Sequence, residues 1–164
     1  MYKLNGIMYS AEEIKAKVIE LAKQIEKDYA GEELLVVAIL KGASVFCADL
    51  IREINLDVRM DFMCVSSYGN STNSSGTVKI IKDLDVDIEN KNVLIVEDII
   101  DSGLTLSNLV DALQTRKPKS LKLCTLLDKP ERRKSNIKVD YVGFVIEDKF
   151  IVGYGIDYAE KYRN

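Results

Sequence analysis

Hydrophobic residues in this sequence fall into two kinds of run, one typical of buried strands and one of amphipathic helices. Residues 34–40 and 92–96 are continuous apolar runs rich in Val and Ile, which favours strands buried on both faces of a parallel sheet. In residues 10–29, apolar side chains recur every three or four positions behind a Ser10–Glu13 capping box, which predicts a helix. The other expected elements are helices over 44–54 and 104–115 and strands over 57–66, 77–82, 121–127 and 141–146.

The order of these elements predicts the fold class. Strands and helices alternate along the chain, so we expect an α/β fold with a mainly parallel central sheet flanked by helices. Ligands of such sheets bind beyond the carboxyl ends of the strands, where segments 41–44, 97–105 and 128–133 should converge. Residues 67–76 are rich in small turn-forming side chains, which favours a lid loop within one domain.

Composition narrows the class of protein and its chemistry. The 164 residues are 47% hydrophobic and 30% charged with a net charge of −3, which indicates one globular domain and not a disordered chain. No apolar run reaches the roughly 20 residues of a membrane span, and no signal peptide is evident, so we expect a cytoplasmic protein. Three widely separated cysteines fit a reducing compartment, and Cys64 and Cys124 are expected to be packing residues.

The absence of histidine restricts the possible chemistry further. Proton transfer must fall to Asp, Glu, Lys, Tyr or Cys, and any metal should be a hard cation on oxygen ligands.

The strongest chemical signal is the segment VLIVEDIIDSGLTL, residues 93–106. A buried strand runs into Glu97 and Asp98, and a turn then opens a helix whose N-terminal N–H groups and dipole favour an anion. Gly103 lets the backbone come close to a phosphate. The carboxylates would repel a bare phosphate, so they need sugar hydroxyls or magnesium as partners, and a phosphorylated ribose combines these groups. The alternative is a plain Ser102 helix cap, which the crowding of three acids and two hydroxyls into nine positions disfavours.

The stretch VEDIIDSGLTL resembles the phosphoribosyl-pyrophosphate loop of type I phosphoribosyltransferases. The segments LKGA at 40–43, SYG at 67–69 and the C-terminal block from Asp148 to Asn164 narrow the resemblance to the hypoxanthine-guanine phosphoribosyltransferases. The similarity runs in order over nearly the whole chain. It implies a type I phosphoribosyltransferase fold in a single domain over 1–164, with a core over about 10–146 and a small hood from segments 1–9 and 147–164.

The resemblance also implies an activity in purine salvage. The enzyme would transfer the phosphoribosyl group from phosphoribosyl pyrophosphate to hypoxanthine or guanine, giving IMP or GMP and pyrophosphate, with Mg²⁺ as cofactor. It implies a homodimer or homotetramer. No membrane partner is expected, and the short basic cluster 132–134 lacks interleaved aromatics in a chain of pI about 5.2, so no nucleic acid is expected either.

The resemblance assigns roles to residues by position. Asp101 would be the acid/base group facing N7 of the purine, and Lys129 would donate to its 6-oxo group. Glu97 and Asp98 would bind the ribose diol and, with Asp157, magnesium. The other expected substrate-binding residues are Ser102, Gly103, Leu104 and Thr105 at the 5′-phosphate, Lys41 and Arg163 at pyrophosphate, Gly42, Ile99, Phe150 stacked on the purine, Ile151 at its edge, and Ser67 and Tyr68 closing over the site. Members of the family often have a cis peptide at the position of Leu40–Lys41.

Two positions depart from the family pattern. Leu104 stands where some members have Lys, and Ala43 replaces a Gly. Without the resemblance, Lys129 belongs to a charged run typical of solvated surface, and Phe150 would more often be a core residue.

Two rival functions are a phosphoribosyltransferase with xanthine or pyrimidine preference, and a non-catalytic regulator that binds phosphoribosyl pyrophosphate or nucleotide. A regulator of transcription or RNA would need a basic face for nucleic acid, which the net charge of −3 does not favour. It would also have no need of an acid/base group such as Asp101. Both observations favour an enzyme.

Overall fold

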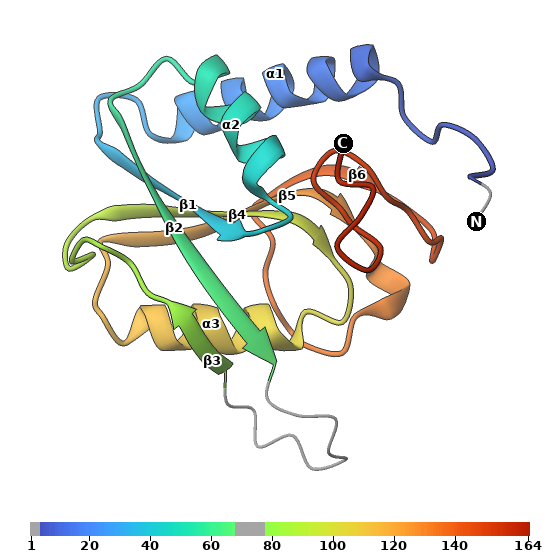
Figure 1. The fold of residues 1–164 in the computed structure, drawn as a ribbon. Helices are drawn as coiled ribbons and strands as arrows, with labels where there is room; N and C mark the ends of the chain where they lie inside the picture. The colour runs from blue at the N-terminus through green and yellow to red at the C-terminus, as the bar shows by residue number, and fades with distance from the viewer. Residues whose placement is uncertain (1–3, 68–77) are drawn as a thin grey trace.

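A six-stranded sheet forms the centre of the protein (Figure 1). In the computed structural model, which describes residues 4–67 and 78–164, the strand order is β3-β2-β1-β4-β5-β6, and every neighbouring pair is parallel except β2 with β3. The predicted fold class is confirmed. The strands are β1 (Leu34–Leu40), β2 (Val58–Ser67), β3 (Val78–Lys82), β4 (Asn92–Ile100), β5 (Ser120–Asp128) and β6 (Tyr141–Val145).

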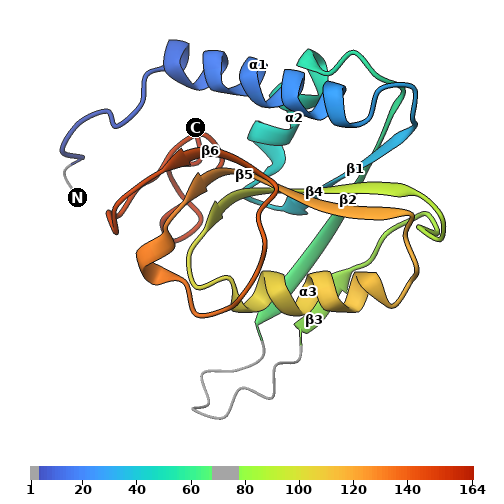
Figure 2. The same ribbon diagram turned by 180° about the vertical axis from the view of Figure 1, so that it is seen from behind.

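Helices cover both faces of this sheet. Helices α1 (Ala11–Asp28) and α2 (Ser44–Glu53) pack on one face, and α3 (Leu104–Gln114) packs on the other, as Figures 1 and 2 show from opposite sides. A short 3₁₀ turn, η1 (Pro130–Arg132), follows β5. Helix α1 begins with the predicted capping box, in which Ser10 Oγ accepts from Glu13 N and the Glu13 carboxylate accepts from Ser10 N. No helix in the described part of the chain is long and apolar enough to cross a membrane.

The two central strands are buried on both faces, which explains their continuous apolar sequence. In β1, Val36 and Ala38 belong to the core beneath α1 and α2, whereas Val37 belongs to the core beneath α3. Alternate side chains of a strand point to opposite faces, so a strand between two helical layers must be apolar at every position.

Strand β4 is longer than the sequence analysis predicted. We expected it to end at Val96, but it continues to Ile100 because Glu97 pairs with Thr125 of β5 and Ile99 with Leu127. The two acids therefore lie inside the last part of a strand and not in the turn after it. Asp101 then follows directly at the carboxyl end of β4.

Candidate active site

The three segments predicted to converge do meet at the carboxyl ends of β1, β4 and β5. Lys129 N, after β5, donates to Ile100 O at the end of β4 over 3.0 Å. The loop after β1 lies against β4 so closely that a Cβ atom on Gly42 would overlap the carboxylate of Asp98. Gly42 therefore has no room for a side chain beside the two strand acids.

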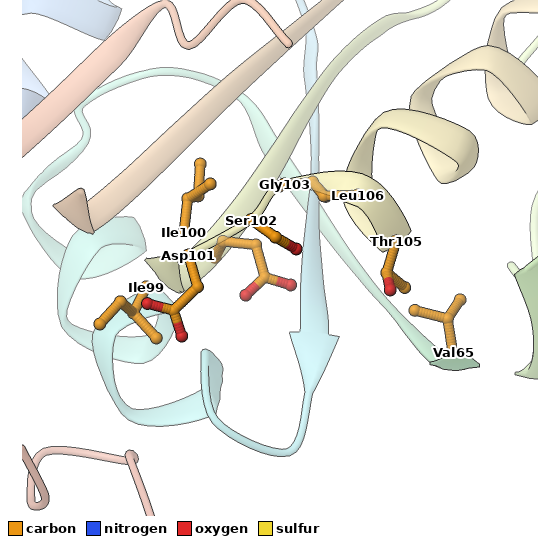
Figure 3. A pocket seen from close by; sticks show the side chains of 9 residues that line it. Val65, Ile99, Ile100, Asp101, Ser102, Gly103, Thr105 and Leu106 are labelled. Carbon is orange, nitrogen blue, oxygen red and sulfur yellow. The ribbon is translucent and has the colours of Figure 1, made fainter. Parts of the chain in front are cut away.

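A pocket of about 220 Å³ lies at the turn between β4 and α3 (Figure 3). In this view, Val65 of β2 closes the side next to Thr105, and Ile99 and Asp101 lie at the opposite side. Gly103 precedes α3 with φ of +71°, a left-handed conformation that favours glycine. The lining residues are Val65, Glu97, Ile99, Ile100, Asp101, Ser102, Gly103, Thr105 and Leu106.

The hydroxyl residues of this turn are not committed to capping the helix. Gly103, and not Ser102, occupies the cap position of α3, and it makes no side-chain cap hydrogen bond. Ser102 Oγ accepts only a long hydrogen bond of 3.4 Å from Leu104 N. The Leu104 side chain is 43% exposed and does not line the pocket. The first turn of α3 thus has N–H groups and hydroxyls available to an anion in the pocket.

The two strand acids, Glu97 and Asp98, are in an environment that disfavours their charge. Burial, and then the neighbouring charge of Asp98, raises the pKa of Glu97 well above its usual value. Burial also raises the pKa of Asp98, against the opposing effects of Glu97, of Ile99 N and of the positive Arg163. Ile99 N donates to Asp98 Oδ1 over 2.7 Å. A cation or a diol that donates hydrogen bonds would relieve this unfavourable arrangement.

Lys129, which is predicted to donate to the purine, is buried directly after β5. It is only 7% exposed, and its Nζ is 3.6 Å from Asp101 Oδ1 and 3.6 Å from Asp148 Oδ1. The solvated-surface interpretation of this charged run is therefore wrong for Lys129, although it holds for the exposed Arg132. The structure brings the predicted acid/base group and the predicted 6-oxo donor together.

Phe150 and Ile151 lie apart from this pocket, in the C-terminal segment. The Phe150 ring is 75% exposed and contacts Tyr158 edge-on at 5.4 Å between centroids, so it is not a core residue. Phe150 and half-buried Ile151 line a second hollow of about 1390 Å³ that segment 4–12 also borders. The predicted closing loop lies outside the described residues, and Tyr68 with it; Ser67 is the last residue of β2.

The residues expected to meet pyrophosphate come from the loop after β1 and from the C-terminal segment. The Leu40–Lys41 peptide is cis, as the resemblance implied. Lys41 Nζ lies 2.6 Å from Glu160 Oε2, and Arg163 Nη2 lies 3.0 Å from Asp157 Oδ1. Each of these cations is therefore paired with a carboxylate of the protein.

The predicted metal ligands do not form one cluster. Within residues 4–67 and 78–164, no group of three or more acidic, cysteine or histidine side chains is arranged to hold a metal ion. The second carboxylate oxygen of Asp157 accepts from Glu160 N over 2.8 Å. A hard cation here would thus depend on substrate oxygens or water for most of its ligands, which suits magnesium.

Arg133, which is not among the predicted site residues, braces the turn from behind. Its Nη2 forms an ion pair with Asp128, a buried acid at the end of β5, and its Nε donates to Asp101 O over 3.4 Å. A Cβ atom on Gly103 would lie 3.1 Å from Arg133 Cδ. The signal available in the sequence was Asp128, an acid that ends an apolar strand and needs a buried partner.

Comparison with known proteins agrees with this geometry. A model of the phosphoribosyl transferase domain matches residues 7–159. The chain is 56% identical over 163 residues to a hypoxanthine-guanine phosphoribosyltransferase of Bacillus subtilis, covering 99% of this chain and 91% of the relative. The chain belongs to the hypoxanthine-guanine phosphoribosyltransferase family.

Other members of this family show the same extent of similarity. The chain is 52% identical over 160 residues to a hypoxanthine phosphoribosyltransferase of Escherichia coli, covering 96% of this chain and 90% of the relative. A crystal structure of a hypoxanthine-guanine phosphoribosyltransferase from Bacillus anthracis, with a HEPES molecule in its active site, superposes with a TM-score of 0.95. That structure is 60% identical in sequence and covers 99% of this chain and 95% of its own. The family resemblance in the sequence is therefore confirmed.

Proposed function

We propose that the protein transfers the 5-phosphoribosyl group from phosphoribosyl pyrophosphate to hypoxanthine or guanine in purine salvage, releasing pyrophosphate and IMP or GMP. The observation that carries the proposal is the pocket at residues 101–105. It combines a helix start suited to a phosphate with an exposed acid, Asp101, next to the buried Lys129. Family membership supports the same reaction.

In the proposed reaction, the bond between ribose C1 and the pyrophosphate oxygen breaks and a bond from C1 to a purine nitrogen forms. Positive charge develops on the sugar ring, as in glycoside transfer. The purine loses a proton, and Asp101 would be the carboxylate that accepts it at N7. Lys129 would donate to the 6-oxo group of the base and so select 6-oxopurines over adenine. The residues proposed to hold the 5′-phosphate are Ser102, Gly103, Leu104 through its backbone, and Thr105.

The other predicted residues complete the proposal. Glu97 and Asp98 would accept hydrogen bonds from the ribose diol, which suits their half-buried position in β4. Magnesium, when bound, would offset charge on the pyrophosphate, with Glu97, Asp98 and Asp157 as its nearest protein ligands. Lys41 and Arg163 would contact pyrophosphate.

The purine contacts of the C-terminal segment remain part of the proposal. Phe150 would stack on the purine and Ile151 would meet its edge through the backbone. The exposed Phe150 ring is available for such stacking. Asp148, two residues before Phe150, already lies 3.6 Å from Lys129 Nζ, so the C-terminal segment borders the proposed base site.

Cytoplasmic location and a homodimer or homotetramer are also proposed. Cys47, Cys64 and Cys124 are free thiols, which fits a reducing compartment. Burial raises the pKa of the Cys47 thiol to about 12, so that thiol is unreactive. Light scattering of the purified protein would measure the number of subunits.

The decisive assay is pyrophosphate release from phosphoribosyl pyrophosphate and magnesium in the presence of hypoxanthine, guanine, xanthine, adenine or uracil. We expect turnover with hypoxanthine and guanine. Turnover with xanthine or uracil alone would show that the enzyme prefers that base and not hypoxanthine or guanine. Binding of phosphoribosyl pyrophosphate without turnover on any base would instead favour a regulator.

A further inference from the structure

Glu160 bridges the two cations that are expected to contact pyrophosphate. Its Oε2 lies 2.6 Å from Lys41 Nζ, and its Oε1 lies 3.4 Å from Arg163 Nη2. These cations are distant in sequence, one in the loop after β1 and one near the C-terminus. One carboxylate therefore contacts both cations, and Asp157 Oδ1 also lies 3.0 Å from Arg163 Nη2.

The backbone holds Glu160 in this position at an energetic cost. Tyr158 and Lys161 pair across a two-residue turn made by Ala159 and Glu160, whose φ angles are +50° and +65°. Two positive φ values define the type I′ turn, which strongly prefers Asn and Gly. In addition, Glu160 N donates to the Asp157 carboxylate over 2.8 Å. A more stable turn residue is readily available, so local stability does not explain why a glutamate stands here.

The bridge can be opened by a ligand arriving from solvent. The side chains of Lys41 and Glu160 are 65% and 66% exposed, so water already competes for their charges. Exposed ion pairs contribute little to folding and exchange partners readily. Pyrophosphate carries more negative charge than one carboxylate and would compete well for the same cations.

We propose that Glu160 acts as an internal competitor of pyrophosphate, occupying Lys41 and Arg163 until phosphoribosyl pyrophosphate displaces it. This inference rests on the proposed function. The same carboxylate would take back both cations as pyrophosphate leaves, so it would weaken product binding as well as donor binding. Glu160 thus sets the affinity of the site for pyrophosphate groups.

The test is the charge-neutral substitution Glu160→Gln, compared with Ala159→Gly as a matched control. Ala159→Gly relieves the same turn but leaves the carboxylate in place. For Glu160→Gln, we expect the KM for phosphoribosyl pyrophosphate and the inhibition constant for pyrophosphate to fall about three- to tenfold, as for the loss of one or two exposed ion pairs. The control should leave both constants unchanged. The difference should shrink as salt is added, because screening weakens exposed charges.

Calorimetric titration of wild type and Glu160→Gln with magnesium pyrophosphate gives a second readout, independent of turnover. Unchanged or weaker pyrophosphate binding in Glu160→Gln would overturn the proposal, because removal of a competing carboxylate must raise the affinity for pyrophosphate. An equal gain in Ala159→Gly would assign the effect to the turn and also overturn it. Turnover of the wild type tests the proposed function separately, so the two can fail independently.

Discussion

Replacing Gly155 with alanine should separate the C-terminal segment from the loop after β1. Gly155 has φ of +100°. A Cβ atom on this residue would overlap the carbonyl oxygen of Gly42, because the two atoms would be much closer than 3.0 Å, the shortest distance that Cβ atoms normally keep. The Gly155 backbone is also fixed from the other side, since its N donates to Arg163 O over 2.8 Å and its O accepts from Arg163 Nη1 over 2.7 Å. The alanine can therefore be accommodated only if one of the two backbones moves.

The magnitude follows from two contributions. A left-handed backbone conformation costs a residue with a side chain about 1–2 kcal/mol. Forcing the two backbones apart costs about 1–3 kcal/mol, as overpacking does in other tight sites. Together these lower the free energy of unfolding by about 2–5 kcal/mol, which for a protein of this size corresponds to a Tm lower by about 5–15 °C.

Gly153→Ala provides the matched control in the same segment. Gly153 has nearly the same φ, +99°, but a Cβ atom there would lie 3.6 Å from Asn164 O, an ordinary contact. The control should show the conformational cost alone, with a Tm lower by about 2–8 °C. Only Gly155→Ala should also raise the KM for phosphoribosyl pyrophosphate, by tenfold or more, because it displaces Arg163 and the loop that carries Lys41.

Thermal unfolding and steady-state kinetics on the three proteins decide the question. If Gly155→Ala costs no more stability than Gly153→Ala and leaves the KM unchanged, then the close backbone contact with Gly42 is not needed for the site. A loss of stability without any change in KM would mean that the contact serves only the fold.

Three further predictions concern the pocket itself. Asp101→Asn should lower kcat at least a hundredfold while changing the KM for phosphoribosyl pyrophosphate less than threefold, since general acid/base groups contribute about 10²–10⁴ in rate; an unchanged kcat would remove Asp101 from this role. Arg133→Met should lower kcat and stability together, by about 3 kcal/mol in unfolding free energy, because it leaves a buried carboxylate unpaired. Arg116→Met, which breaks an ion pair with Asp83 at 2.8 Å, should leave kcat unchanged, and equal kinetic losses in both variants would contradict the bracing role of Arg133. Glu97→Gln should stabilise the ligand-free protein, by an amount that grows as the pH rises above 4.5. Burial raises the pKa of Glu97, so above pH 4.5 the folded protein keeps a proton on Glu97 that the unfolded chain has lost, and this difference destabilises the wild type. Thermal unfolding of both proteins from pH 4.5 to 8 measures this difference, and a gap that does not change with pH would show that Glu97 ionises normally.

The sequence predicts the sheet well because the buried strands carry a strong and simple signal. Residues 34–40 match β1 in full, since a strand covered on both faces must be apolar throughout. The same rule fails at the end of β4, where Glu97 and Asp98 are polar although the backbone still pairs with β5. Hydrophobicity therefore marks where a strand is covered by helices, and the sheet extends further where it enters the site.

Some charged residues of the site can be recognised from their sequence neighbours, and others only from partners that the fold brings to them. Asp101 lies in a dense local motif, so its neighbours point to its role. Arg133 looked like one of three surface cations, and only the fold shows its ion pair with Asp128. Glu160 is 119 residues from Lys41, and nothing local indicates that the two meet. Partners that are distant in sequence are fixed by topology, which one sequence does not display.

If the proposed function holds, a chain with a net charge of −3 would bind a polyanion by exchanging the anions at its site. In the ligand-free protein each expected substrate-binding cation already has a carboxylate beside it: Lys41 has Glu160, Arg163 has Asp157, and Lys129 has Asp101 and Asp148. At Lys41 and Arg163, pyrophosphate oxygens would replace the carboxylates as partners, so binding need not rely on bulk positive charge. The cost of breaking these pairs would lower the affinity for the donor, and it would equally lower the affinity for the released pyrophosphate. Such a site would favour turnover over tight binding, because a product that is bound less tightly leaves sooner and product release limits many enzymes.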